Sequence, residues 1–356
     1  MSEETLAQQH HHYHPLRVRR VVEETPDAKS FVLEIPADLE RAFRYRAGQY
    51  LTFRIPWQGQ ELVRCYSLAS SPDVESEHKV TVKRVEGGRA SHWMNDRLRE
   101  GDTAMVLPPA GRFVLREGGR ALLLFAGGSG ITPVISLVKT ALATTARRMK
   151  LVYANRDERS IIFRAQLDAL AARHPDRLQV VHSLDARDGF LSPERVRREA
   201  SGFAEADFYL CGPGAFMAVV EDGLEAAGAP RERVYKELFV SPEDDVPSAE
   251  QRERAREAEA GAGACETLCV TLDGKTHELR YQAGRTVLES ALDAGLQPPF
   301  SCQDAYCSCC MAKLKGGQVK MRKNDCLTQR DLDDGWVLTC QSIPQTRGVH
   351  VSWDES

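Results

Sequence analysis

ALLLFAGGSGITPV, residues 121–134, joins an apolar run to a glycine-rich loop and then to residues that favour a helix. The apolar run has the length of a buried strand. Glycines after such a strand let the backbone approach a pyrophosphate group at the N-terminus of the next helix, and Pro133 suits the first turn of that helix. The pattern G-x-G-x-x-P lacks the Gly-Lys-Ser/Thr of a nucleoside triphosphate loop. It therefore predicts a loop that binds a pyrophosphate group, although a plain glycine-rich turn from strand to helix has the same residues. The glycines in question are Gly127, Gly128 and Gly130.

The segments that follow repeat the change from strand to helix. Strands are expected at 150–155, 177–183 and 207–212, and helices at 133–144 and 160–173. Alternating β and α elements of this length fold as a parallel sheet with helices on both faces. We therefore expect a doubly wound α/β domain over residues 120–240.

Residues 15–119, upstream, are mostly β in character. Short runs rich in Val, Leu, Ile and aromatic residues, bounded by Pro, Gly and acidic turns, lie at 30–35, 50–55, 63–69 and 79–85. Several short strands at this spacing predict a β-barrel or a β-sandwich.

Two stretches of the β-rich region suit an aromatic, anionic ligand. In RCYSLAS, residues 64–70, Arg64 offers a planar fork for phosphate, Tyr66 a flat face and Ser67 a hydroxyl. In GGRAS, residues 87–91, two glycines and a hydroxyl precede helical sequence, which makes an anion site at a helix N-terminus. For residues 64–67 the alternative is a tetrapeptide that arises by chance in a strand. For residues 87–91 the alternative is an ordinary turn with an N-cap at Ser91.

The third region begins after an acidic, alanine- and arginine-rich stretch, residues 241–264, which predicts a linker with a helical middle. In SCQDAYCSCCMA, residues 301–312, three cysteines are spaced C-x4-C-x2-C, and a fourth follows in VLTCQS. This is the plant-type spacing for a [2Fe-2S] cluster held by four thiolates. A structural zinc site more often uses two C-x2-C pairs, so it fits less well. The proposed ligands are Cys302, Cys307, Cys310 and Cys340, and Cys309 is predicted not to be a ligand.

Composition excludes some classes of protein. The chain has 356 residues, is 42% hydrophobic and 28% charged, and has a net charge of −4, which argues against nucleic-acid binding. No apolar run approaches the roughly 20 residues that cross a bilayer, and the N-terminus lacks the apolar stretch of a signal peptide. We expect a monomer in the cytoplasm, where cysteines are more often metal ligands or buried thiols than disulfides. The histidine-rich residues 1–14 predict a flexible terminus.

Taken together, the motifs resemble the ferredoxin–NADP reductase superfamily from about residue 15 to 240. Residues 265–356 resemble a plant-type ferredoxin domain with an α+β β-grasp fold. Beyond the cysteines, the second resemblance rests on TLCVTLDGKTHELRY, TVLESALDAGL, PPFSC and KNDCLTQRDLDDGWVLTCQS. Tyr306 departs from the family, which usually has a small residue before the second ligand. The resemblance implies an antiparallel FAD-binding β-barrel at 15–119, an NAD(P)H-binding domain at 120–240 and a ferredoxin domain at 265–356.

The resemblance also assigns roles to single residues. Ser67 would lie near the flavin N5, Thr132 near the nicotinamide, and Cys211 near the carbon that donates hydride, while Phe239 would cover the flavin ring. A buried thiol and a core phenylalanine are the alternatives for the last two. The 87–91 loop would receive a pyrophosphate, which favours FAD over FMN. The implied flavin ligands are Arg64, Cys65, Tyr66, Ser67, Gly87, Gly88, Arg89, Ala90 and Ser91, and the implied nicotinamide-site residues also include Pro133, Gly212 and Pro213.

The implied activity is electron transfer from NAD(P)H through FAD and [2Fe-2S] to a terminal oxygenase, of the Rieske type as in 3-ketosteroid 9α-hydroxylase. Arg156 or Arg159 could meet the 2′-phosphate of NADPH, whereas the neighbouring Asp157 or Glu158 could repel it, and the resemblance favours NADH. A di-iron epoxidase or hydroxylase, or a membrane desaturase, are alternative acceptors. A zinc-stabilised binding module on an inactive reductase is the alternative from another class.

Overall fold

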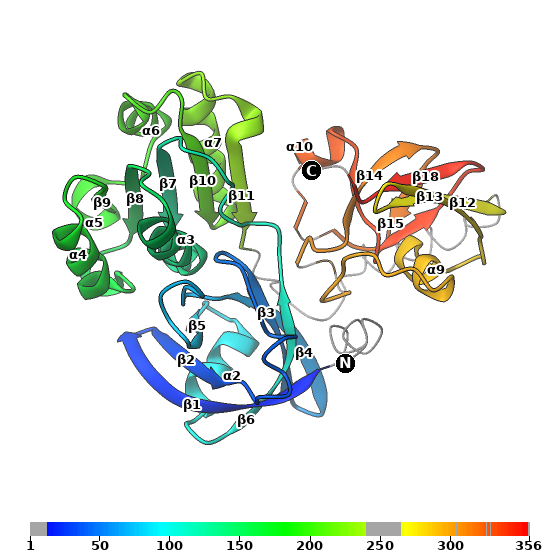
Figure 1. The fold of residues 1–356 in the computed structure, drawn as a ribbon, viewed down its shortest axis with the longest axis horizontal. Helices are drawn as coiled ribbons and strands as arrows, with labels where there is room; N and C mark the ends of the chain where they lie inside the picture. Colours follow the sequence, from blue (N-terminus) through cyan, green and yellow to red (C-terminus); the bar gives the residue numbers. More distant parts are fainter. Residues whose placement is uncertain are drawn as a thin grey trace. The chain divides into compact units, whose positions relative to one another are not determined.

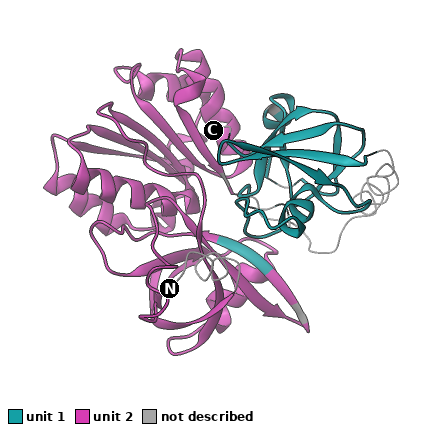
Figure 2. Cartoon of the chain, turned by 45° about the vertical axis from the view of Figure 1, so that its right-hand side comes forward, with its two compact units in different colours: residues 1–11, 63–65, 242–356 teal, residues 12–62, 66–241 magenta. Residues whose placement is uncertain are grey.

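The computed structural model describes residues 13–239 and 265–354, except 304, 306, 325 and 328. The chain divides into two compact units, one holding residues 12–62 and 66–241 and the other holding 242–356 with 63–65 (Figures 1 and 2). Residues 63–65 are part of a strand of the N-terminal sheet and are described with it. Residues 1–12 of the expected flexible terminus, the expected linker and Tyr306 lie outside the described residues.

The N-terminal domain is an antiparallel sheet of six strands in the order β4-β3-β6-β1-β2-β5. An antiparallel bridge between Leu68 and Val80 joins its two edges, so the sheet closes into a barrel. Gln58 and Gly59 both have positive φ, the type I′ geometry that suits a tight hairpin. The barrel's elements are β1 (His14–Thr25), β2 (Ala28–Glu34), β3 (Tyr50–Trp57), β4 (Gln60–Ser67), β5 (His78–Lys83), α2 (Arg89–Arg97) and β6 (Thr103–Ala110).

The second domain is a parallel sheet in the order β11-β10-β7-β8-β9, which confirms the doubly wound prediction. Leu122, Leu124 and Ala126 of β7 pack into one core, and Leu123 and Phe125 pack into the other, as the period of a strand buried on both faces requires. The strands are β7 (Leu122–Gly127), β8 (Met149–Asn155), β9 (Leu178–Leu184), β10 (Asp207–Gly212) and β11 (Val234–Leu238).

The helices of this domain differ from the expected ranges at their starts. α3 begins at Ile131, two residues before Pro133, and α4 begins at Arg164, after the short 3-10 helix η2, so the expected start at residue 160 is wrong. Asp157 explains the second difference, because its side chain and that of Ser160 cap η2 and separate it from α4. The helices are η1 (Gly128–Gly130), α3 (Ile131–Thr144), η2 (Glu158–Ser160), α4 (Arg164–Arg173), α5 (Asp185–Asp188), α6 (Pro193–Ala200), α7 (Gly214–Ala226) and η3 (Arg231–Arg233).

The C-terminal unit contains a mixed sheet in the order β13-β12-β18-β14-β16. A second, small antiparallel sheet is formed by β15 and β17. The central pair, β12 and β18, is parallel, and Thr286 and Glu289 form a capping box at the start of α9. This is the expected α+β fold. Its elements are β12 (Thr267–Leu272), β13 (Lys275–Arg280), α9 (Val287–Asp293), β14 (Met311–Gly316), β15 (Val319–Met321), α10 (Gln329–Asp333), β16 (Trp336–Leu338), β17 (Ser342–Pro344) and β18 (Val349–Ser352).

No helix in the described part of the chain has the length and apolar character needed to cross a membrane.

Candidate functional site

The expected flavin motif lies at the end of β4. Tyr66 is half-buried, and its ring packs edge-on against Phe53 with centroids 5.7 Å apart. Ser67 is buried, and its hydroxyl donates a hydrogen bond to Glu237 Oε2 at 3.2 Å. Arg64 Nη1 donates to the carbonyl of Val63 at 2.7 Å, and Cys65 is half-buried. The motif therefore presents an aromatic ring and a held hydroxyl at one end of the strand.

Three residues from distant strands meet at this end of the barrel. Cys211 of β10 pairs in register with Glu237 of β11, and Glu237 accepts the Ser67 hydrogen bond. Cys211 is fully buried; burial, with a further contribution from Glu237, raises the pKa of its thiol and keeps it neutral. Glu237 was missed at the sequence level, although it lies in KELFVS. A carboxylate at the carboxyl end of a parallel strand was the available signal.

The glycines of the nucleotide loop permit close packing where the sheet order reverses. A Cβ on Gly130 would lie 2.1 Å from the carbonyl oxygen of Cys211, and Cβ atoms on Gly127 and Gly212 would meet the ring of Phe216 at 2.9 and 2.7 Å. No side chain caps the N-terminus of α3, and the Ile131 N–H donates to the carbonyls of Gly128 and Ser129 in the turn before it. A helix N-terminus of this kind favours an anion through its dipole and its remaining N–H groups. β7 and β10 are the neighbouring strands at which the order of the sheet reverses, and nucleotides bind to doubly wound sheets at the carboxyl ends of such strands.

The other expected nicotinamide-site residues lie near the carboxyl ends of β7, β10 and β11. Thr132 is buried and its hydroxyl donates to the carbonyl of Ser129 at 3.0 Å, while Pro133 lies in the first turn of α3. Pro213 is the N-cap of α7. Phe239 donates its backbone N–H to the carbonyl of Gly212 at 3.3 Å, and its side chain packs against the α/β core. The structure thus brings Thr132, Cys211 and Phe239 to the same end of the sheet as the glycine loop.

The 87–91 loop leads directly into α2. Gly87 has a φ of 69°, and Gly88 is the N-cap of the helix, with no side chain capping it. The Ser91 hydroxyl lies inside the turn, where it accepts the N–H of Val85 at 3.1 Å, so the alternative of an N-cap at Ser91 is wrong. Arg89 and Ala90 begin the helix. The uncapped N–H groups of α2 fit a phosphate group.

Arg156 has a defined partner in the barrel. Its Nη2 lies 3.2 Å from Asp27 Oδ2, and Lys83 Nζ lies 3.8 Å from the same oxygen. Asp157 accepts the N–H of Ser160, and Glu158 pairs with Arg164. Two cations near the nucleotide loop thus share one carboxylate.

The cysteine loop has an unusual backbone. Gln303, Ala305 and Ser308 all have positive φ, between 47° and 64°, which non-glycine residues rarely adopt. Three such residues between Cys302 and Cys310 make a tight loop of the backbone. Within it, the backbone nitrogen of Cys302 lies 3.5 Å from Cys307 Sγ. Strain of this kind persists only where the surroundings fix it, which is typical of a ligand cradle.

The four proposed ligands are all buried and form two pairs. Contact with the Cys307 thiol, and burial, raise the pKa of Cys302, and Cys340 and burial do the same for Cys310. Among the described residues, no three or more His, Cys, Asp or Glu side chains are arranged around a single metal ion. Four neighbouring thiols of this kind suit a [2Fe-2S] cluster, in which each of two irons takes two thiolates.

Family models match each of the three domains. Residues 15–115 match the oxidoreductase FAD-binding domain, residues 124–222 the oxidoreductase NAD-binding domain, and residues 270–345 the 2Fe-2S iron-sulfur cluster binding domain. Fold and site together define a flavin and iron–sulfur oxidoreductase.

Curated relatives match the whole chain. The ferredoxin reductase component of 3-ketosteroid-9-alpha-monooxygenase from Mycolicibacterium smegmatis is 42% identical over 348 residues, covering 97% of this chain and 98% of the relative. One of the subunits of 1,2-phenylacetyl-CoA epoxidase from Escherichia coli is 33% identical, covering 96% and 98%. The solved structure of phthalate dioxygenase reductase has a TM-score of 0.57 at 25% identity, covering 96% and 97%.

The chain therefore belongs to the family of oxygenase reductase components that carry FAD-binding, NAD-binding and 2Fe-2S domains. It uses NAD(P)H, FAD and a [2Fe-2S] cluster to pass electrons to a terminal oxygenase, as the sequence predicted.

Proposed function

We propose that the oxygenase partner is of the Rieske type and acts on a 3-ketosteroid, and that the electron donor is NADH. Identity of 42% along nearly the whole chain to a 3-ketosteroid-9-alpha-monooxygenase reductase carries the choice of partner. The 33% identity to a component of the epoxidase makes the epoxidase the second candidate. We also propose that the reductase acts as a monomer in the cytoplasm.

The charges near the nucleotide loop support NADH. Arg156 has an exposed side chain, but its guanidinium pairs with Asp27, which also lies near Lys83. A 2′-phosphate would have to compete with the Asp27 carboxylate for the Arg156 guanidinium, and Asp157 follows Arg156 directly in the chain.

The proposed site residues divide the work by position. Bound FAD would supply the link between two-electron hydride transfer and the one-electron chemistry of the cluster. Glu237 holds the Ser67 hydroxyl in one orientation at the end of β4, and Tyr66 offers its ring beside it. Cys211, neutral and buried, presents an uncharged side chain to the nicotinamide. Phe239, directly after β11, covers the flavin ring. The glycines and the N-terminus of α3 bind the dinucleotide phosphates.

The cysteine loop has a different task. Cys302, Cys307, Cys310 and Cys340 are the proposed cluster ligands, and the Cys302 N–H, at 3.5 Å from Cys307 Sγ, is placed to bond a ligand sulfur.

The first experiment is anaerobic titration of the purified full-length protein with NADH and, separately, with NADPH. We expect the flavin and cluster absorbance to bleach with stoichiometric NADH and more slowly with NADPH. Faster reduction by NADPH would overturn the choice of donor, and no bleaching with either would overturn the proposed site.

The partner is tested by reconstitution. The reductase is mixed with purified 3-ketosteroid 9α-hydroxylase or with the oxygenase component of phenylacetyl-CoA epoxidase, and product is measured against NADH consumed. Coupled steroid hydroxylation supports the proposal. Coupled turnover only with the epoxidase would replace it.

A further inference from the structure

Helix α3 carries one polar stripe on an otherwise apolar surface. Ser136, Lys139 and Thr140 follow the i, i+3, i+4 spacing of a single helix face, and all three are buried. A helix buried on all sides normally presents apolar residues, because each polar group must find a partner. The hydrogen-bond partners of these three side chains therefore indicate the role of this face of α3.

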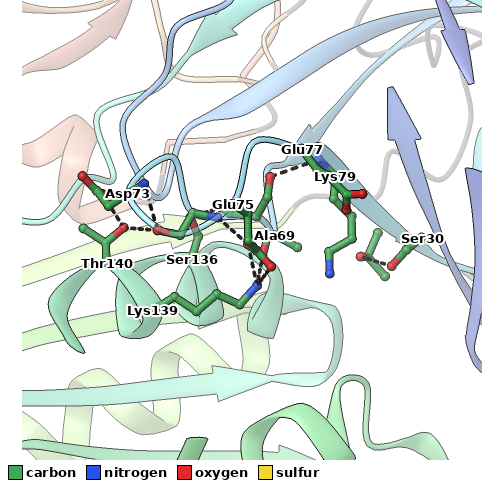
Figure 3. Close-up of polar contacts among 12 residues, drawn as sticks. Ser30, Ala69, Asp73, Glu75, Glu77, Lys79, Ser136, Lys139 and Thr140 are labelled. Carbon is green, nitrogen blue, oxygen red and sulfur yellow. Dashed lines mark hydrogen bonds and ion pairs between the residues drawn. The ribbon is translucent and has the colours of Figure 1, made fainter. Parts of the chain in front are cut away.

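All three side chains bond one segment of the barrel, residues 69–75, which begins two residues after Ser67 (Figure 3). Ser136 Oγ donates to the carbonyl of Ser70 at 2.6 Å. Thr140 Oγ1 donates to Asp73 Oδ2 at 2.9 Å and lies 2.7 Å from the hydroxyl of Ser71.

Lys139 makes the central contacts of the stripe. Its ammonium donates to the carbonyl of Ala69 at 2.9 Å and to both carboxylate oxygens of Glu75 at 3.0 Å. An ammonium has three donors, and these three acceptors match them. Glu75 is fixed in turn, because its Oε2 accepts the N–H of Ser71 at 2.8 Å.

Both ends of this link are rigid. On the barrel side, the Leu68 N–H donates to the carbonyl of Gln49 and the Ala69 N–H donates to the carbonyl of Lys79. On the other side, Lys139 lies within α3, whose first turn follows the nucleotide loop. The link thus joins the segment after the flavin motif directly to the helix that follows the nicotinamide motif.

Stability alone accounts poorly for an ion pair at this place. Lys139 is 4% exposed, and burial, with Lys79 acting in the same direction, lowers its pKa while Glu75 opposes the change. Well-packed apolar residues commonly hold such an interface as firmly as a buried ion pair does. An ammonium with three fixed acceptors also restricts the helix and the barrel segment to one relative position.

We propose that Lys139 is a positioning residue that sets the nucleotide loop against the flavin end of the barrel and thereby sets the rate of hydride transfer. The inference rests on the proposed roles of residues 64–67 and 127–133. Small errors in the approach of two reacting groups are costly, since a displacement of about 1 Å can slow a reaction by roughly a hundredfold.

The test uses the full-length holoprotein and rapid anaerobic mixing with NADH. In Lys139→Met, which keeps most of the unbranched side chain but removes the ammonium, we expect the limiting rate of flavin reduction to fall about tenfold or more. FAD content, cluster absorbance and the NADH dissociation constant from the same series should stay near the parent values. An unchanged limiting rate in the folded variant would overturn the proposal.

Lys150→Met is the matched control. Lys150 also forms a largely buried ion pair, with Glu199 at 2.7 Å, but both residues belong to the α/β domain. We expect it to lower the melting temperature without changing the limiting rate. An equal loss of rate in both variants would show that rate merely follows stability.

A double variant, Lys139→Met/Glu75→Gln, separates positioning from folding and serves if the single variant fails to fold. It removes the half-buried carboxylate that the single variant leaves without its ammonium, so stability should recover. If the limiting rate stays low, positioning is supported; if the rate recovers with stability, the link is only structural. A parent protein that NADH does not reduce at all would instead refute the proposed function.

Discussion

The cysteine loop and the flavin–nicotinamide site are assembled over very different lengths of chain. Three of the four proposed cluster ligands lie within residues 302–310, and backbone torsions shape the loop that carries them. Ser67 and Glu237, by contrast, are 170 positions apart and meet only because two domains pack together. A local site can be damaged one residue at a time, whereas an assembled site should respond to changes in the packing between its parts.

The largest expected effect tests the local site. Cys310→Ser should lose the cluster, because a serine oxygen replaces one of four thiolates. Iron and sulfide analysis with visible absorbance measures the loss, and the flavin should still be reduced by NADH.

Cys309→Ser is the matched control in the adjacent position. It should retain iron, sulfide and the cluster spectrum at parent levels. If Cys309→Ser loses the cluster and Cys310→Ser keeps it, the ligand assignment is wrong.

The second effect tests the assembled site through its packing. In Gly130→Ala the new Cβ would lie 2.1 Å from the Cys211 carbonyl, so β10 or the nucleotide loop must move. We expect a loss of about 1–3 kcal/mol in unfolding free energy and a clear fall in the rate of flavin reduction by NADH. Gly119→Ala, where a Cβ meets nothing within 4 Å, is the control and should change neither. Parent-like kinetics in Gly130→Ala would show that this contact does not shape the site.

The third effect is a tuning of the local site. Gln341 is buried, and its Nε2 donates to the carbonyl of Gln303 at 2.9 Å and lies 3.6 Å from Cys340 Sγ. Hydrogen bonds to ligand sulfur stabilise the reduced, more negative cluster. Gln341→Leu should therefore lower the midpoint potential of the cluster, measured by redox titration with electron paramagnetic resonance. A potential equal to or above that of the parent would contradict this role.

The smallest effect concerns pH and the barrel. His78 Nε2 donates to the carbonyl of Phe43, while Nδ1 is buried without a partner among the described residues, and burial lowers the pKa of the ring. As the pH falls, His78 is therefore protonated in the unfolded chain at a higher pH than in the folded protein. The contribution of neutral His78 to stability is complete above about pH 6.5 and declines below it.

The measurement is melting temperature against pH for the parent and His78→Gln. Gln keeps an N–H donor for Phe43 but does not titrate, so the decline below about pH 6.5 should be shallower in the variant. Identical slopes would show that His78 does not contribute to the acid sensitivity.

Motifs with regular local spacing were the easiest part to predict. The β7 strand, the glycine loop and α3 follow from residues 121–134, and the cysteine spacing suggested the cluster type without any structure. Helix starts were less accurate, because the cap at Asp157 and the 3-10 turn after it depend on a few side-chain hydrogen bonds. The alternative of an N-cap at Ser91 is wrong for the same reason, since its hydroxyl bonds the turn and Gly88 is the N-cap.

Glu237 and Lys139 were not singled out from sequence. Both lie in segments that look like ordinary strand and helix. Their proposed roles depend on partners in the barrel, Ser67 for Glu237 and Glu75 for Lys139. Pairing between residues so far apart is not encoded in any local period.

The amino-acid sequence by itself determined the domain classes, the family and the proposed metal ligands, because period, turn chemistry and cysteine spacing act over short stretches of chain. Only the tertiary structure decided which side chains face one another across the flavin–nicotinamide junction. The reason is physical: a buried hydroxyl or ammonium must find a partner, and which partner it finds depends on how separately folded elements pack.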